Sequence, residues 1–173
     1  MSATCFYPLF FTTSFGGSDG SHKKTTNIGT QAYAFLIEEE KDYKITSSGY
    51  TPACDNLSSS PAEHCGILGA IILLYILTYC YADTTNTNNT SSLLFFLDNA
   101  EVLSRCTRDP TGLNISNYMK QDFDYWQILR TLINSLPFYL DLQKIKSHST
   151  TTLKSNTKKL GRKVNDLADK LAE

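Results

Sequence analysis

Three short runs rich in aromatic and β-branched residues occur in the first fifty residues, a pattern typical of β-strands. Aromatic and β-branched residues fill residues 6–14, and a stretch rich in glycine and serine follows them and contains Asp19. The pattern predicts a first strand over residues 6–14 or slightly beyond, closed by a turn at Asp19. Two further strands are predicted over residues 30–37 and 43–50, and the acidic residues between them suit a hairpin connection.

A long apolar run, GILGAIILLYILTYCYA at residues 66–82, predicts the main helix of the chain. Ser60 and Pro61 suit its first two positions, Glu63 then completes a capping box, and His64 is expected as a surface or helix-start residue. The run is just long enough to span a bilayer, but it lacks flanking Lys or Arg anchors. We therefore expect a helix covered by protein on every side and no membrane partner, with a membrane-anchored protein as the alternative.

The second half of the chain mixes strands and helices. The apolar residues LLFFL predict a buried central strand that ends at Asp98, and an apolar stripe that includes Trp126 predicts an amphipathic helix. In chain order we expect a loop over 83–92, a strand over 93–97, a short helix over 100–106, a helix from 117 or 118 to 135, a strand over 138–145, a loop over 149–157 and a helix over 164–173. This order predicts an α/β fold.

Length and composition describe one ordinary globular domain over residues 1–173, with 41% hydrophobic and 19% charged residues. Five cysteines without a Cys-x-x-Cys spacing indicate neither a disulfide framework nor a zinc site. We recognise no secretory signal, so the expected compartment is intracellular, in the cytoplasm or nucleus. The net charge of -1 gives no signature of nucleic-acid binding, but a late basic region could face phosphates. Its members are Lys144, Lys146, Lys154, Lys158, Lys159, Arg162, Lys163 and Lys170.

Three acidic residues stand at the ends of predicted elements: Asp19, Glu63 and Asp98. Taken singly, a turn residue, a capping-box residue and a helix N-cap are ordinary structural roles. Together, we expect them to project toward one shared edge of the sheet. Carboxylate oxygens suit Mg²⁺, and two such ions about 4 Å apart can activate a water molecule and stabilise the leaving oxygen in phosphodiester hydrolysis.

Six motifs in this order resemble the ribonuclease H domain, most closely the version attached to retroelement reverse transcriptases. They are Asp19-Gly20-Ser21, residues 29–37, Ser60-Pro61-Ala62-Glu63, the segment LLFFLDN ending at Asp98-Asn99, residues 145–148 ending in His148, and residues 165–172. The resemblance implies a ribonuclease H-like mixed five-stranded sheet flanked by helices. It also implies hydrolysis of the RNA strand of an RNA–DNA hybrid with two Mg²⁺ ions, which Mn²⁺ could replace.

The same resemblance implies a role for each matched residue. Asp19 would bridge both ions, Glu63 and Asp98 would ligate one, and Asp169 would complete the second. His148 would assist proton transfer or product departure. Expected substrate contacts, made to the 2′-hydroxyls and phosphates of the hybrid, are Ser21, Ser60, Asn99 and the late lysines. A fused reverse transcriptase domain is a second expected partner.

Two other functions stay open at this point. The chain could be a catalytically silent ribonuclease H-like module that positions nucleic acid or a fused polymerase, and failure to bind Mg²⁺ or Mn²⁺ would favour this. It could also be a related nuclease, such as a resolvase or an exonuclease, that uses the same carboxylates on DNA. A comparison of hybrid, duplex DNA and junction substrates separates these functions.

Overall fold

The structure, a computed structural model, describes residues 14–23, 28–37, 44–51, 60–81, 92–107, 123–146 and 156–173. The elements in chain order are β1 (Ser14–Lys23), β2 (Ile28–Ile37), β3 (Lys44–Thr51), α2 (Ser60–Tyr81), β4 (Ser92–Leu97), α3 (Ala100–Thr107), α5 (Phe123–Asn134), β5 (Tyr139–Lys144) and α6 (Asn156–Ala172). The predicted order of strands and helices is confirmed across the described residues.

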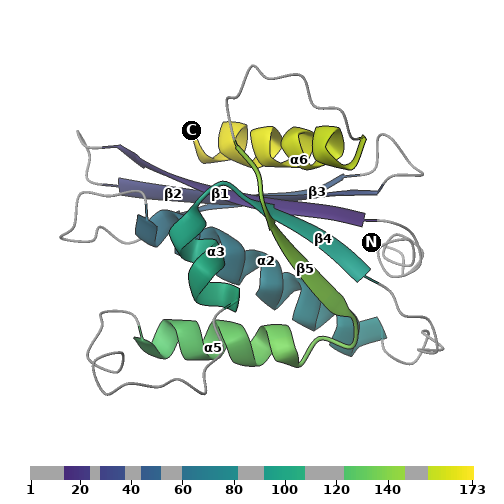
Figure 1. Ribbon diagram of the computed structural model, residues 1–173. Coiled ribbons are helices and arrows are strands. Elements are labelled where there is room, and N and C mark those ends of the chain that lie inside the picture. The colour runs from purple at the N-terminus through teal and green to yellow at the C-terminus, as the bar shows by residue number, and fades with distance from the viewer. Residues whose placement is uncertain are drawn as a thin grey trace.

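The strands form one mixed sheet in the order β3-β2-β1-β4-β5, which confirms the predicted five-stranded arrangement (Figure 1). β1, β2 and β3 are a consecutive antiparallel meander, whereas β4 pairs in parallel with β1 and β5 pairs in parallel with β4. The parallel pairings require crossover connections, and α2 lies between β3 and β4 in the chain for this purpose. β1 is therefore the central strand, with the meander on one side and the parallel pair on the other.

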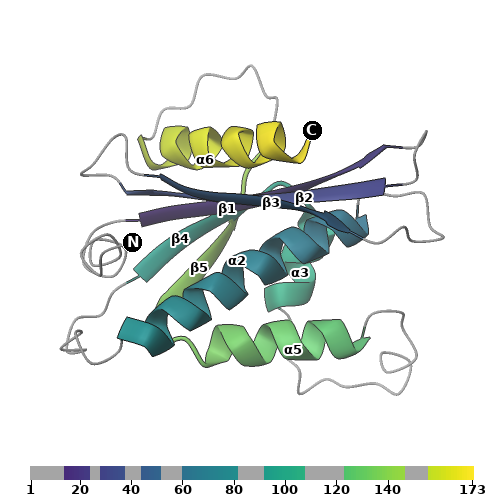
Figure 2. The same ribbon diagram turned by 180° about the vertical axis from the view of Figure 1, so that it is seen from behind.

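Helices cover both faces of the sheet. α6 lies across one face, whereas α2, α3 and α5 lie on the other, as the two opposite views show (Figures 1 and 2). The sequence of β4 explains this arrangement, because its alternate side chains point to opposite faces and are apolar on both. Phe95 belongs to the larger core beneath α2 and α5, and Phe96 belongs to the smaller core beneath α6.

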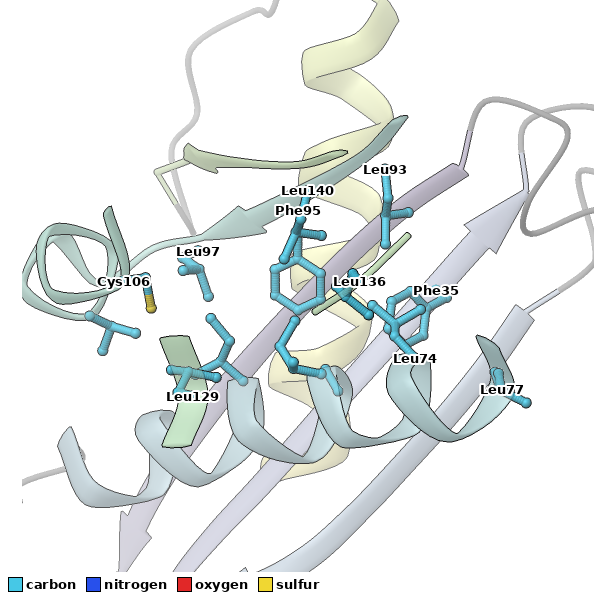
Figure 3. Packing of buried hydrophobic residues seen from close by; sticks show 14 of the residues in the cluster. Phe35, Leu74, Leu77, Leu93, Phe95, Leu97, Cys106, Leu129, Leu136 and Leu140 are labelled. Atoms are coloured by element: carbon cyan, nitrogen blue, oxygen red, sulfur yellow. The ribbon is translucent and has the colours of Figure 1, made fainter. Parts of the chain in front are cut away.

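The larger core fills the space between the sheet, α2 and α5 (Figure 3). Phe35 and Phe95 meet edge to face in its centre, with ring centroids 5.9 Å apart. α2 contributes Ile67, Ile71 and Leu74, each almost fully buried. Trp126 also belongs to this core, as the apolar stripe of its helix predicts.

The outer side of α2 differs from the prediction of a helix covered on every side. Ile72, Ile76 and Tyr79 are exposed, because no described element packs over the second half of this helix on that side. Its length and composition alone would allow residues Ala62–Cys80 to cross a membrane, yet 39% of this stretch is buried within the protein. The inner side of α2 packs on the sheet, and the absence of a membrane partner stays a prediction.

The first strand lies later in the chain than predicted. The glycine- and serine-rich stretch that predicts a turn is the strand itself, Ser14–Lys23, and Asp19 lies within it rather than at its end. Gly16 explains the discrepancy, because a Cβ atom there would lie 2.8 Å from Cε2 of Phe95. Small residues in β1 serve the close packing of the two faces rather than a change of chain direction. Residues 6–13 of the predicted strand lie outside the described residues.

The closing helix is longer than predicted. α6 begins at Asn156, whereas the sequence predicts a loop over residues 149–157 and a helix from residue 164. The Lys-rich first half of α6 hides an apolar side that includes Gly161, where a Cβ atom would lie 2.6 Å from the ring of Phe96. Residues 83–91 and 149–155 of the predicted loops, and residues 117–122 of the predicted amphipathic helix, lie outside the described residues.

Candidate active site

Asp19 is a buried carboxylate on the central strand, with only 7% of its surface exposed. Side chains alternate along β1, so Asp19 and Gly17 face α6, whereas Ser18 and Gly20 face α2. Contacts support this assignment, since a Cβ atom at Gly17 would meet Val164 of α6. Oδ1 of Asp19 accepts a hydrogen bond of 2.7 Å from the backbone N–H of Gly20.

Gly20 brings the start of α2 against β1. A Cβ atom at Gly20 would lie 2.8 Å from Cα of Glu63 and closer still to the Glu63 nitrogen and the Ala62 carbonyl carbon. Only a residue without a side chain allows this approach. Because Glu63 lies in the first turn of α2, the contact sets its carboxylate beside the strand that carries Asp19.

Asp98 follows the last residue of β4 in a bend and is half-buried. β4 pairs directly with β1, so the end of β4 lies next to the strand that carries Asp19. The next residue caps α3, because Oδ1 of Asn99 accepts hydrogen bonds from the backbone nitrogens of Glu101 (2.8 Å) and Val102 (3.2 Å). With Asn99 as the cap, Asp98 is not the N-cap of this helix.

The last turns of α6 bring Asp169 to the same region. α6 packs closely on β1 at Gly17, where a Cβ atom would lie 3.4 Å from the backbone nitrogen of Asn165. The far end of the helix is held by Thr30 of β2, whose hydroxyl donates a hydrogen bond to the carbonyl oxygen of Ala172. Asp169 lies between these two attachments.

The charges of three other carboxylates act on Asp19. Burial, the largest cause, raises the pKa of Asp19 from 3.8 to about 7, and the charge of Asp98 is the next largest. Asp169 and Glu63 raise this pKa further, while the hydrogen bond from Gly20 lowers it. Four carboxylates from β1, α2, the end of β4 and α6 therefore share one electrostatic environment beside β1, where β4 ends.

The donor chemistry of this group fits a hard divalent cation, because all four side chains supply carboxylate oxygens. Within the described part of the chain, however, no three His, Cys, Asp or Glu side chains are arranged to hold a metal ion. The four negative charges act on one another over distances longer than a metal–ligand bond. Because the charges are alike, the carboxylates repel one another. The four carboxylates thus converge without forming a ligand shell by themselves.

Comparisons with solved structures identify the fold. LC11-RNase H1 from a compost metagenome, solved in complex with an RNA/DNA hybrid, matches with a TM-score of 0.54 over 91% of this chain and 92% of its own, at 15% identity. The protease-reverse transcriptase of prototype foamy virus matches with a TM-score of 0.59 at 11% identity. This chain has the ribonuclease H-like fold.

That match to the viral protein covers 92% of this chain but 21% of the viral chain. The N-terminal ribonuclease H domain of Rv2228c from Mycobacterium tuberculosis also matches, with a TM-score of 0.50 at 12% identity over 93% of this chain and 91% of that one. No family model and no curated protein sequence matches the chain. The structural neighbours are thus ribonuclease H domains, at identities that show the fold alone.

The remaining predicted site residues lie at different places in the ribonuclease H-like fold, and some of them lie outside the described residues. Ser21 is half-buried on β1, directly after Gly20, and Ser60 is the first residue of α2. The side chain of Asn99 caps α3, and its role in substrate contact stays a prediction. His148 and Lys154 lie outside the described residues. Of the late basic residues that the structure describes, Arg162 is half-buried. The others are exposed: Lys144, Lys146, Lys158, Lys159, Lys163 and Lys170.

His64 lies near the start of α2, as expected, but its side chain is buried and does not lie at the surface. Its ring centroid lies 4.5 Å from that of Trp126 and 5.8 Å from that of Tyr125 on α5. Arg105 of α3 lies over the same Trp126 ring, 5.3 Å from its centroid. These aromatic contacts fix the first turn of α2, which carries Glu63, against α5. Sequence spacing does not reveal them, because they join helices that lie far apart in the chain.

The raised pKa of Asp19 predicts an unusual pH dependence of stability. The folded state binds the Asp19 proton more tightly than the unfolded chain, so the metal-free protein loses stability as pH rises from about 4 to about 7. The loss attributable to Asp19 should be on the order of 2 to 4 kcal/mol. Urea unfolding in EDTA at pH 4 and pH 8 measures it.

Asp19→Asn should remove this contribution and unfold at a higher urea concentration than wild type at pH 8. Asp166→Asn, which changes an acidic residue of α6 outside the group of four, should retain the wild-type difference between the two pH values. Equal pH dependence in wild type and Asp19→Asn would contradict the assignment.

Proposed function

We propose that this protein is a metal-dependent ribonuclease H, an endonuclease that hydrolyses the RNA strand of RNA–DNA hybrids. The observation that carries the proposal is the buried Asp19 of β1, on which the charges of Asp98, Asp169 and Glu63 converge. A cluster of this kind has a high electrostatic cost in a metal-free protein and is typical of sites that bind cations. A structural neighbour solved with an RNA/DNA hybrid supports the substrate.

Asp19, Glu63, Asp98 and Asp169 would hold two Mg²⁺ ions, or Mn²⁺ in their place. When bound, such a pair supplies an activated water molecule and stabilises the oxygen that leaves the phosphodiester. Asp19 contributes a carboxylate that exchanges its proton near neutral pH, so protons compete with cations there below about pH 7. His148, beyond β5, would move a proton or assist product departure.

Substrate recognition would rest on the sugar and the backbone of the hybrid. The 2′-hydroxyls of RNA are the feature that DNA lacks, so a protein that contacts them distinguishes the strands without reading sequence. Ser21 follows Asp19 and Gly20 on β1, and Ser60 begins the helix that carries Glu63. These two residues, Asn99 and the exposed late lysines are the proposed contacts.

We propose that this activity belongs to a retroelement reverse transcriptase inside the cell. The support is the foamy virus neighbour, of which the matching part is 21% of a chain that also carries a protease and a reverse transcriptase. A fused reverse transcriptase domain is accordingly the proposed protein partner.

A cleavage assay on four labelled substrates tests the function. With Mg²⁺ or Mn²⁺, the protein should release fragments from the RNA strand of a hybrid and leave duplex DNA, a DNA junction and single-stranded RNA intact. EDTA should abolish cleavage. Cleavage of the DNA substrates instead would assign a related nuclease, and binding of hybrid without cleavage or metal binding would assign a silent module.

A further inference from the structure

Asn165 is the most deeply buried polar side chain among the described residues. It lies on α6 with 0% of its surface exposed, and neither its Oδ1 nor its Nδ2 makes a hydrogen bond. Asparagine is mostly exposed in folded proteins, and a buried amide without a partner is unfavourable. A buried amide of this kind calls for a specific explanation, such as a role in binding or catalysis.

The position of Asn165 limits what that partner can be. Asn165 and Asp169 are four residues apart on α6, so their side chains are neighbours on the same side of the helix. On β1, Gly17 and Asp19 likewise share the face toward α6. Gly17 lies against the backbone of Asn165, and the charge of Asp169 acts on Asp19. The amide is thus one helical turn from the carboxylate cluster, in the interface that the cluster occupies.

Two of the other buried polar atoms lie on the opposite face of the sheet from Asn165. Ser18 Oγ and Gln31 Oε1 are also buried without a hydrogen bond. Ser18 faces α2, since a Cβ atom at Gly66 of that helix would lie 3.4 Å from its Cβ. Gln31 is paired with Gly20 in the sheet and shares its face, toward α2. Both therefore lie on the side of the sheet opposite Asn165.

We propose that Asn165 is a positioning residue, whose Nδ2 donates a hydrogen bond to the carboxylate of Asp169 and turns it toward the cluster when divalent cations bind. The inference rests on the proposed function. Amide and carboxylate groups four residues apart on a helix form such bonds, and partners of ligating carboxylates orient them for the metal. Asn165 itself touches neither metal nor substrate.

Calorimetric titration of the full chain with MnCl₂ tests the proposal without an activity readout. Asn165→Leu, which replaces the amide by an apolar group of related shape, should weaken Mn²⁺ binding by about 10- to 100-fold. The melting temperature of this variant in EDTA should equal or exceed that of wild type, because an unfavourable buried amide is removed. A structural role alone predicts the reverse, a lower melting temperature with unchanged affinity.

A second variant guards against overpacking by the larger leucine. Asn165→Ala should show the same loss of affinity, and Asn134→Ala, at an exposed asparagine ending α5, should bind Mn²⁺ as wild type does. In cleavage assays, the Asn165 variants should need about tenfold more metal for half-maximal rate.

The outcomes separate the two proposals. If wild type binds Mn²⁺ and cleaves hybrid while Asn165→Leu and Asn165→Ala bind Mn²⁺ equally well, the role of Asn165 is overturned and the proposed function stands. If wild type neither binds Mn²⁺ nor cleaves hybrid, both are overturned.

Discussion

Asp98→Asn should lower the rate of hybrid cleavage at least about 10³-fold, equivalent to about 4 kcal/mol of transition-state stabilisation. The substitution keeps the shape of the side chain but replaces a charged oxygen by an amide nitrogen, which cannot ligate Mg²⁺. It also removes the largest single charge acting on Asp19, so the pKa of Asp19 should fall. Single-turnover cleavage at saturating protein measures the loss.

The fold should survive this substitution. Asp98 lies in a half-buried bend, and the cap of α3 is supplied by Asn99, so the start of α3 does not need the charge of Asp98. The melting temperature in EDTA should therefore equal or exceed that of wild type, since one repulsive charge is gone. Asp166→Asn on α6 is the matched control and should cleave at the wild-type rate. Equal cleavage by wild type and Asp98→Asn would place the active site elsewhere.

Gly20→Ala should have the largest effect on stability, a loss of about 3 kcal/mol or more. The added Cβ would collide with backbone atoms of Ala62 and Glu63, which cannot rotate away as a flexible side chain would. β1 and the start of α2 would have to separate, and the Glu63 carboxylate would move away from Asp19. Urea unfolding measures the first effect and Mn²⁺ titration the second.

Gly49→Ala provides the matched control for this substitution. Gly49 also lies in a strand, but a Cβ atom there would make only an ordinary contact of 3.4 Å with Nε2 of Gln31. Its unfolding free energy should therefore change by less than about 1 kcal/mol, and Mn²⁺ affinity should not change. If Gly20→Ala and Gly49→Ala are equally stable, the close approach of α2 to β1 does not hold in solution.

The elements with strong periodicity were predictable from the sequence. LLFFL before Asp98 predicts the buried strand β4, and the apolar run after Glu63 predicts α2, because each pattern is apolar over the length of one element. Motif order supplied the sheet arrangement, which periodicity alone does not determine. The ribonuclease H resemblance therefore carried the fold prediction further than local patterns could.

The errors have a shared physical origin in tertiary contacts. Glycines in β1 predict a turn when read locally, yet Gly16 and Gly20 are there because Phe95 and α2 press against the strand. In the same way, Gly161 and four lysines or arginines make the first half of α6 resemble a polar loop when the sequence is read locally. Likewise, a buried Asn165 without a partner cannot be recognised before the packing of α6 on β1 is known.

The attachment of α6 to β2 joins an early and a late part of the described chain. The hydrogen bond between Thr30 and Ala172 joins residues 142 positions apart, and the charge of Asp169 acts on Asp19 across a similar separation. Contacts between such distant segments form late in folding, because closing a long loop costs entropy first. During translation, therefore, the group of four carboxylates would stay incomplete until α6 had emerged from the ribosome.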